Sequence, residues 1–152
     1  MPGLVERAGL KDLNALYEIE RRCFGKEAYS KFLLRLLLMD PRSIALKYVT
    51  ENGSVLGFVI GRIERRRGEL VGRIYTLNVD PRYRRRGIGK SLMTALEDEF
   101  KRRGCRKSGL EVAVDNEAAV SLYRSLGYVF LGKLKNYYGP GRDAFLAVKE
   151  LR

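Results

Sequence analysis

The sequence predicts one mixed α/β domain over residues 1–152, in which a mostly antiparallel mixed sheet is flanked by helices. With 152 residues, of which 45% are hydrophobic, the chain can bury the core of one globular domain. Three strand-like segments follow one another with short turns between them, and segments with helical apolar spacing separate the other strands. The predicted order is β-α-α-β-β-β-α-β-α-β-β.

A strand and two helices are predicted at the start of the chain. Apolar residues recur at helical spacing from Leu13, which predicts a helix that ends near Cys23. Ser30 can cap a second helix that continues through Leu38. The pair Asp40-Pro41 ends this helix, because proline disfavours the helical conformation of the residue before it.

Three consecutive strands are predicted next, at residues 43–50, 55–64 and 69–79. The turn at 51–54 contains Asn-Gly, the strongest short-range signal for a hairpin. A second turn, at 65–68, has the sequence RRRG. Strands joined in this way predict an antiparallel meander.

Helices and strands alternate in the rest of the chain. Apolar spacing predicts a helix from Gly87 to about Arg103, and Gly104 lies where a left-handed cap belongs. The apolar run at 108–114 predicts the next strand.

A last helix and two strands complete the predicted order. Asp115 or Asn116 can cap the helix, and Gly127 lies just past its end. Strands are predicted at 128–134 and 144–151, around a polar loop.

Composition limits the chemistry. Lysine and arginine outnumber aspartate and glutamate by 30 to 18, which gives a net charge of +12. Such a charge favours anionic partners, but nucleic acid, the ribosome, an anionic membrane and a phosphorylated cofactor all stay open. The chain has no histidine, so proton transfer must use carboxylate, tyrosine, lysine, cysteine or water.

Cysteine spacing and apolar runs exclude further classes. Cys23 and Cys105 match no metal-ligand spacing, so we expect two buried thiols and no metal. The first residues carry no signal-peptide pattern, and Arg35 interrupts the longest apolar run, 32–39. We therefore expect a soluble, cytoplasmic protein without membrane contact.

The segment DPRYRRRGIGKSL, residues 80–92, predicts an anion site. Leu92 stands where a dinucleotide-binding fingerprint needs its third glycine, and Arg84 stands where a phosphate-binding P-loop needs its first. The pattern that fits this segment is a basic turn before a helix whose first N–H groups are unpaired. Gly87 and Gly89 would let a ligand approach the main chain. The alternative is a solvated charge run with a tight turn.

Glu111 lies in the middle of an apolar predicted strand. Strand alternation places Glu111 and Ala113 on one face, and their apolar neighbours on the other. A carboxylate in this position faces solvent, a partner or a working cleft. From the pattern alone, an exposed strand face stays open as the simpler explanation.

Three blocks of the chain resemble one known family, the Gcn5-related N-acetyltransferases (GNAT). The cofactor motif of that family, Gln/Arg-x-x-Gly-x-Gly/Ala, is matched by residues 84–89. The likeness extends over nearly the whole chain, through LNVDPRYRRRGIGKSLM, LEVAVDNEAAVSLYRSLGYV and NYYGPGRDAFLAV. It is greatest to the RimI-type enzymes, which acetylate the α-amine of protein N-termini.

The resemblance implies the GNAT fold and acetyl-coenzyme A (acetyl-CoA) as cosubstrate. Amides of residues 85–90 would hold the pyrophosphate, and the strand segment 77–79 would pair with the pantetheine arm. Asn116 would lie beside the cofactor, although a purely structural role as helix cap is as well supported. The implied cofactor residues are Leu77, Asn78, Val79, Arg84, Arg85, Arg86, Gly87, Ile88, Gly89, Lys90 and Asn116.

The resemblance also implies the catalytic and acceptor-binding residues. Glu111 would take the proton of the attacking amine, directly or through water, and Tyr123 would assist the leaving thiolate. Glu27 matches a glutamate that some relatives use, so the base stays open between Glu27 and Glu111. Gly25 replaces a proline that is common in relatives, which leaves the acceptor preference open. The implied acceptor-binding residues are Phe24, Glu27, Tyr29, Tyr137 and Tyr138.

We therefore expect acetyl transfer to the α-amine of a protein, with a ribosomal protein and the ribosome as candidate partners. Two alternatives stay open. One is acetylation of a small amine or a lysine side chain, and the other is a basic RNA- or ribosome-binding module without turnover. Nucleic acid is not expected as a substrate, because the sequence lacks the patterns of RNA-binding strands and loops.

Overall fold

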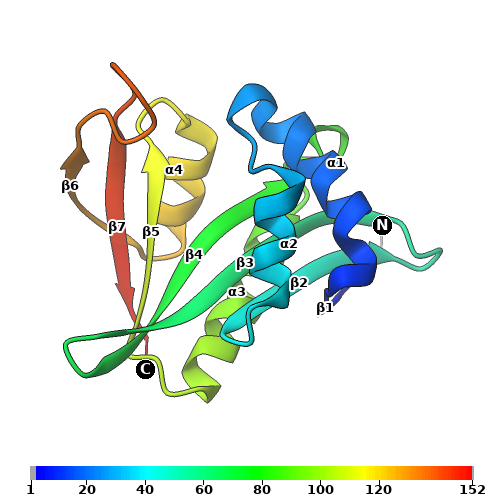
Figure 1. Ribbon diagram of the computed structural model, residues 1–152, viewed down its shortest axis with the longest axis horizontal. Helices are drawn as coiled ribbons and strands as arrows, with labels where there is room; N and C mark the ends of the chain where they lie inside the picture. Colours follow the sequence, from blue (N-terminus) through cyan, green and yellow to red (C-terminus); the bar gives the residue numbers. More distant parts are fainter. Residues whose placement is uncertain (1–2, 152) are drawn as a thin grey trace.

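A seven-stranded sheet runs through the molecule in the computed structural model, which describes residues 3–151 (Figure 1). The strand order is β1-β2-β3-β4-β5-β7-β6, and every neighbouring pair is antiparallel except β4 and β5. This architecture confirms the predicted order of elements. The strands are β1 (Gly3–Arg7), β2 (Ser43–Thr50), β3 (Val55–Arg66), β4 (Glu69–Val79), β5 (Lys107–Ala113), β6 (Val129–Leu134) and β7 (Ala144–Glu150). The helices are α1 (Leu13–Phe24), α2 (Lys31–Met39), α3 (Ile88–Arg102) and α4 (Glu117–Ser125), with short 3-10 turns η1 (Leu10–Asp12), η2 (Gly25–Glu27) and η3 (Pro81–Tyr83).

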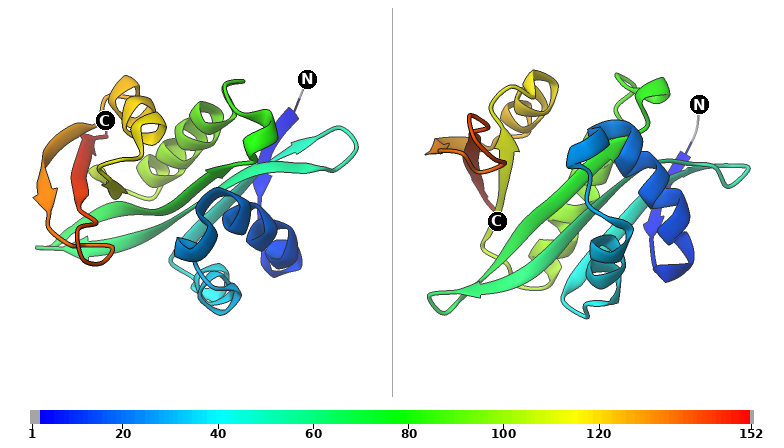
Figure 2. Two further views of the ribbon diagram at one scale, coloured as in Figure 1. Left: turned by 90° about the horizontal axis from the view of Figure 1, so that it is seen from above. Right: turned by 45° about the horizontal axis from the view of Figure 1, so that its top comes forward.

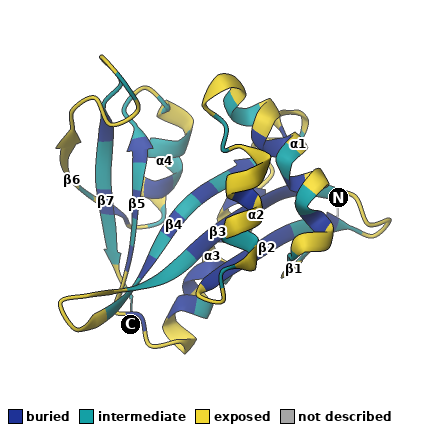
Figure 3. Ribbon diagram, viewed as in Figure 1, coloured by how far each residue is buried: buried dark blue, intermediate teal, exposed yellow. Residues whose placement is uncertain are grey.

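The helices cover both faces of the sheet. Figure 2 shows α1 and α2 on one face and α3 and α4 on the other. Beneath α1 and α2, Leu16 and Leu34 pack with Phe58 in one apolar cluster. Beneath α3, Phe100 belongs to a larger cluster that includes Ile74. Burial is therefore concentrated where helices meet strands, as the colouring of Figure 3 shows.

The predicted helix caps are present. The Ser30 hydroxyl accepts a hydrogen bond from the Leu33 N–H at 3.1 Å, at the start of α2. Of the two candidate caps for α4, Asn116 serves, since its side chain accepts from the Ala119 N–H at 3.2 Å. Gly104 follows α3 in a left-handed conformation, with φ of +87°, as its position predicted.

The predicted RRRG turn is too long. Strand β3 continues through Arg66, so only Arg67 and Gly68 form the turn, with φ of +52° and +82°. Positive φ at both central residues is typical of the two-residue hairpin turns whose twist matches the flanking strands. Such a turn lets the hairpin extend two residues further than predicted, because Arg65 and Arg66 pair with β4.

A bulge in β4 divides the strand into two parts that face opposite ways. Ile60 of β3 pairs with Thr76, and Gly61 pairs with Ile74, so Tyr75 is an extra residue in β4. Before the bulge, Ile74 packs in the α3 cluster. After it, the side chains of Thr76 and Asn78 bond to α1, on the other face of the sheet.

Strands β4 and β5 separate along their length. They pair over three residue pairs only, Val71 with Lys107, Gly72 with Ser108 and Arg73 with Gly109. Beyond these pairs the two strands diverge, as Figure 1 shows.

No helix in the described part of the chain is long and apolar enough to cross a membrane.

Candidate active site

Two cavities meet where β4 and β5 diverge. The smaller has a volume of about 210 Å³ and lies between the two strands, α1 and α4. The larger has a volume of about 480 Å³ and extends to the start of α3. Four residues line both cavities and mark their junction: Phe24, Leu77, Asn116 and Ala119.

The larger cavity gathers the predicted cofactor residues from three parts of the chain. All of them except Arg86 line it. The Arg86 guanidinium lies instead over the ring of Tyr83, 5.4 Å from its centroid. Arg84 folds back toward the strand, and its Nε donates to the Val79 carbonyl at 3.3 Å. The roles themselves stay predictions.

Gly87 and Gly89 are required as glycine for different structural reasons. Gly87 is the N-cap of α3 and has φ of +81°, a conformation that favours glycine. A Cβ on Gly89 would lie 3.2 Å from Leu122 Cδ2, so this glycine also lets α3 pack closely on α4. The N–H groups at the start of α3 lack intrahelical partners and border the cavity, which makes this end of the helix receptive to an anion.

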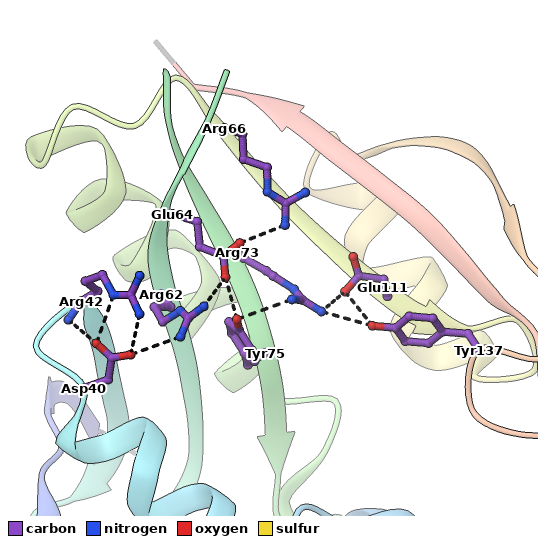
Figure 4. Close-up of polar contacts among 9 residues, drawn as sticks. All are labelled: Asp40, Arg42, Arg62, Glu64, Arg66, Arg73, Tyr75, Glu111 and Tyr137. Carbon is purple, nitrogen blue, oxygen red and sulfur yellow. Dashed lines mark hydrogen bonds and ion pairs between the residues drawn. The ribbon is translucent and has the colours of Figure 1, made fainter. Parts of the chain in front are cut away.

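Glu111 lies in the smaller cavity and is held in place by neighbours (Figure 4). Its Oε1 accepts from Arg73 Nη2 at 2.9 Å and from the Tyr137 hydroxyl at 3.4 Å. The hydroxyl of Tyr138 donates to the main-chain oxygen of Glu111 at 3.4 Å. Its side chain is only 16% exposed, so the alternative of an open, solvated strand face is wrong.

Arg73 was not predicted from the sequence as a site residue. Its guanidinium bonds to Glu111 and Tyr137 and stacks on Tyr75, with 4.6 Å to the ring centroid. Glu64 accepts from the Tyr75 hydroxyl at 2.6 Å, which continues the polar chain along the sheet, as Figure 4 shows. No local pattern marks Arg73, because its main partner is 38 positions away in the chain.

Tyr123 of α4 lines the smaller cavity and is 6% exposed. Its ring packs edge to face on Tyr128, with centroids 5.8 Å apart. Burial raises the pKa of the Tyr123 hydroxyl well above its ordinary value. The phenol is therefore protonated near neutral pH and can donate a hydrogen bond.

Four of the five predicted acceptor residues line the smaller cavity. Phe24, Glu27, Tyr29 and Tyr138 line it. Tyr137 lies beside it, with its ring centroid 4.9 Å from that of Tyr138. Burial raises the pKa of both Tyr29 and Tyr138 to about 12, so these rings are neutral hydrogen-bonding groups.

An ion pair involves Glu27, one of the residues that line the smaller cavity. Glu27 of η2 is paired with Arg142, which belongs to the loop between β6 and β7. The two residues are 115 positions apart in the chain, so the pair joins the two loops that flank the cavity.

Glu20 is a second site residue that was not predicted from the sequence. It is 2% exposed, yet it lines the smaller cavity. One carboxylate oxygen accepts from Thr76 Oγ1 at 2.8 Å and from Asn78 Nδ2 at 3.0 Å, and the other accepts from the Tyr29 N–H at 3.1 Å. The sequence contains a signal for this burial, because Glu20 follows Leu16 by four residues and so lies on the apolar stripe of α1. Burial raises the pKa of its carboxyl group.

The prediction of two buried thiols is right for Cys105 and wrong for Cys23. Cys23 is half-buried at the wall of the larger cavity, and its thiol donates to the Val79 carbonyl at 3.3 Å. It lies there because the last turn of α1 packs against the end of β4. Burial raises the pKa of both thiols, which disfavours the nucleophilic thiolate. Among residues 3–151, no group of three potential metal ligands comes together.

The arrangement joins an anion-receptive cavity to one lined by carboxylates and phenols. A long anionic molecule bound along the first would reach the second at the junction beside Leu77 and Asn116. Groups suited to proton transfer, Glu20, Glu111 and Tyr123, then surround its end.

Comparison with known proteins gives the following relatives. Residues 13–128 match the family described as "Acetyltransferase (GNAT) family". The chain is 37% identical over 127 residues to the ribosomal protein bS18-alanine N-acetyltransferase of Escherichia coli strain K12, covering 84% of this chain and 81% of the relative. It is 37% identical over 120 residues to N-alpha-acetyltransferase 30 of Schizosaccharomyces pombe, covering 78% and 79%. The crystal structure of the ribosomal-protein-S18-alanine N-acetyltransferase from Escherichia coli is similar, with a TM-score of 0.85, 28% identity and coverage of 99% and 94%.

Proposed function

The chain belongs to the acetyltransferase (GNAT) family, and we propose that it acetylates the α-amine at the N-terminus of a protein. Family membership makes it an N-acetyltransferase that uses acetyl-CoA. The observation that carries the proposal is the junction of the two cavities. It lets a thioester that enters from the start of α3 meet an amine that enters between η2 and the loop 135–143.

The larger cavity suits acetyl-CoA. Its basic loop and the free N–H groups of α3 match a pyrophosphate. The segment Leu77 to Val79 borders both the cavity and the divergence of β4 from β5, where the pantetheine arm would lie against the strand. Asn116, at the junction, would contact the arm while it caps α4.

The acceptor cavity is small, and Glu27 in its lining is held by Arg142, which favours a slender group such as a chain terminus. The chemistry also favours an α-amine. Its ammonium has a pKa near 8, against about 10.4 for lysine, so reaching the neutral amine near pH 7 takes about 3 kcal/mol less for the α-amine. Two relatives, the ribosomal protein bS18-alanine N-acetyltransferase and N-alpha-acetyltransferase 30, are named for such acceptors.

Glu111 and Tyr123 are the proposed catalytic pair. The α-ammonium first loses one proton, which a water held by Glu111 conducts away. The neutral nitrogen attacks the thioester carbon, and backbone N–H groups near Val79 would stabilise the oxyanion. The C–S bond then breaks, and the second proton of the nitrogen goes to the thiolate, whose sulfur accepts a hydrogen bond from Tyr123. No enzyme nucleophile is needed.

A net charge of +12 suits a protein that works beside RNA. We therefore extend the proposal to acetylation of a ribosomal protein in the cytoplasm, in contact with the ribosome. The relative from Escherichia coli is named for an acceptor of this class.

Acetylation of a peptide library tests the proposal. Peptides with free N-termini should be acetylated, and the same peptides with blocked N-termini but free lysines should not. Turnover of blocked peptides or of small amines alone would overturn the α-amine assignment. Tight RNA binding with a steep salt slope and no binding of acetyl-CoA would favour the binding-module alternative.

Substitutions test the catalytic pair. Glu111→Gln and Tyr123→Phe should each lower kcat by about 10² to 10⁴-fold while acetyl-CoA binds normally. Unchanged rates in both variants would remove these assignments. A selective loss in Glu27→Gln would move the base to the η2 loop.

A further inference from the structure

The acceptor cavity contains a buried carboxylate that lacks a counter-ion. Three carboxylates line this cavity, Glu20, Glu27 and Glu111. Glu27 is paired with Arg142, and Glu111 is paired with Arg73 at 2.9 Å. Within residues 3–151, Glu20 forms no ion pair, although it is the most deeply buried of the three.

Other buried acids in the described part of the chain have cations. Asp12 is paired with Lys47 at 2.9 Å, and Asp80 is paired with two arginines. Glu97 is paired with Lys149 at 2.7 Å. A buried charge without a partner is strongly unfavourable, so an acid that keeps such a position is expected to meet a cation.

The contacts of Glu20 are those of an ionised carboxylate. Its three partners, Thr76 Oγ1, Asn78 Nδ2 and the Tyr29 N–H, all donate to it. Asn78 Nδ2 also donates to Thr76 Oγ1 at 2.8 Å, which fixes the hydroxyl proton of Thr76 on the side of Glu20. Asn78 Oδ1 is buried and has no donor in the described structure. This corner of the cavity therefore holds more acceptors than donors.

Glu20 lies close to the strand segment proposed to hold the thioester arm. The bulge at Tyr75 turns Thr76 and Asn78 toward α1, and these two residues place Glu20 directly beside the strand segment proposed to carry the thioester arm. Glu20 lines the smaller cavity, whose wall continues through Leu77 into the larger one.

We propose that Glu20 is the counter-ion of the acceptor ammonium and the group that finally receives its first proton. The ammonium, R–NH₃⁺, binds at Glu20 and transfers one proton to its carboxylate, directly or through the water held by Glu111, which leaves R–NH₂ and a neutral carboxyl group. The amine then attacks the thioester, the C–S bond breaks, and the second nitrogen proton goes to the thiolate. Product release returns the Glu20 proton to solvent. This inference rests on the proposed function.

The surroundings of Glu20 support this assignment. Burial raises its pKa, which makes it a better base than an exposed carboxylate. The phenols and the thiol nearest to it have raised pKa values and are neutral near pH 7, so they add no negative charge that would compete with Glu20 for the ammonium. The ionisable groups that face the cavity or the Glu20 carboxylate are Cys23 of α1, Glu27 of η2, Tyr29, Tyr75 of β4, Glu111 of β5, Tyr123 of α4 and Tyr138, with Arg73 behind Glu111.

The pH dependence of Glu20→Gln tests the proposal. Near pH 7 the variant should lose about 10² to 10⁴-fold in kcat/KM, because the ammonium has lost both its counter-ion and its base. The loss should shrink above about pH 9, where an α-ammonium with a pKa near 8 is neutral in solution. A merely structural role gives a loss that is the same at every pH. Asp98→Asn, which removes an exposed carboxylate from α3, is the control and should have no effect.

Thr76→Val provides a second test that keeps the carboxylate. It removes one donor from Glu20, and a lost hydrogen bond to the ionised form raises a carboxyl pKa. In a plot of kcat against pH, the rise on the acid side should therefore move to higher pH. An unmoved rise, or a Glu20→Gln loss that does not change with pH, overturns the proposal.

Both measurements use whichever amine the wild-type protein acetylates. If that amine proves to be a lysine or a small molecule, the proposed function fails, while the role of Glu20 is still tested by the same comparison, with the loss shrinking above the pKa of that amine, which is about 10.4 for lysine.

Discussion

Replacing Gly87 by alanine should weaken the binding of acetyl-CoA, whereas the same change at Gly68 should lower only stability. The two glycines are closely matched, with φ of +81° and +82°, and an added Cβ would meet nothing within 4 Å at either position. Gly87 begins α3 at the larger cavity, and Gly68 lies in the β3–β4 turn. The pair therefore separates the backbone requirement from the ligand requirement.

The magnitude follows from the backbone alone. Since no clash occurs, the cost is that of a left-handed residue with a Cβ, about 1 to 2 kcal/mol. Gly68→Ala should lower the free energy of unfolding by this amount. In Gly87→Ala the free loop can relieve the strain by moving, and acetyl-CoA must then restore it, so Kd should rise about 5- to 30-fold.

Urea unfolding and isothermal titration with acetyl-CoA measure the two effects. Gly68→Ala should keep the wild-type Kd. If folded Gly87→Ala also binds acetyl-CoA with the wild-type Kd, the N–H groups at the start of α3 do not hold the pyrophosphate, and the reasoning about the larger cavity is refuted.

Two further predictions concern stability. The hydrogen bonds and charge of Arg82 lower the pKa of buried Asp80, so this carboxylate stabilises the fold above its unfolded pKa of about 4 and loses that contribution as the pH falls through its lower folded pKa. Asp80→Asn should therefore lower the free energy of unfolding by about 2 kcal/mol at pH 7 and weaken its dependence on acid pH, as urea titrations at several pH values would measure. An unchanged acid limb would contradict this. Tyr128→Phe removes hydroxyl contacts of 2.7 Å to both Glu97 and Ser108. It should lower the free energy of unfolding in urea by about 1 to 3 kcal/mol and leave the Kd for acetyl-CoA unaltered. Wild-type stability would show that the buried hydroxyl cluster contributes nothing.

Local signals in the sequence predicted most of the fold. The caps at Ser30 and Asn116 and the left-handed glycines after α3 and α4 each depend on a few neighbouring residues, and each is present in the structure. The length of the 65–68 turn could not be predicted in the same way. Arginine has no preference for positive φ, so nothing in the RRRG sequence indicated that Arg67 would adopt it.

The predicted site residues come together, but their partners were not predictable from spacing. Residues proposed to hold the cofactor line one cavity, and those proposed for catalysis line the other. The pairing of Arg73 with Glu111, and that of Glu20 with Thr76 and Asn78, joins distant parts of the chain. The second also depends on the bulge at Tyr75, which regular strand alternation cannot reveal.

The bulge at Tyr75 decides which face of the sheet the end of β4 presents to α1. If β4 kept all its residues but lost the bulge, Thr76 would fall on the same face as Ile74 and the rest of the strand would turn over. Leu77 and Val79 would then replace Thr76 and Asn78 on the α1 side, leaving Glu20 among hydrocarbon groups. Removing Tyr75 itself would join Ile74 directly to Thr76 and leave both facing as they do now, so protein engineering in this segment should either keep the bulge or delete Tyr75 alone.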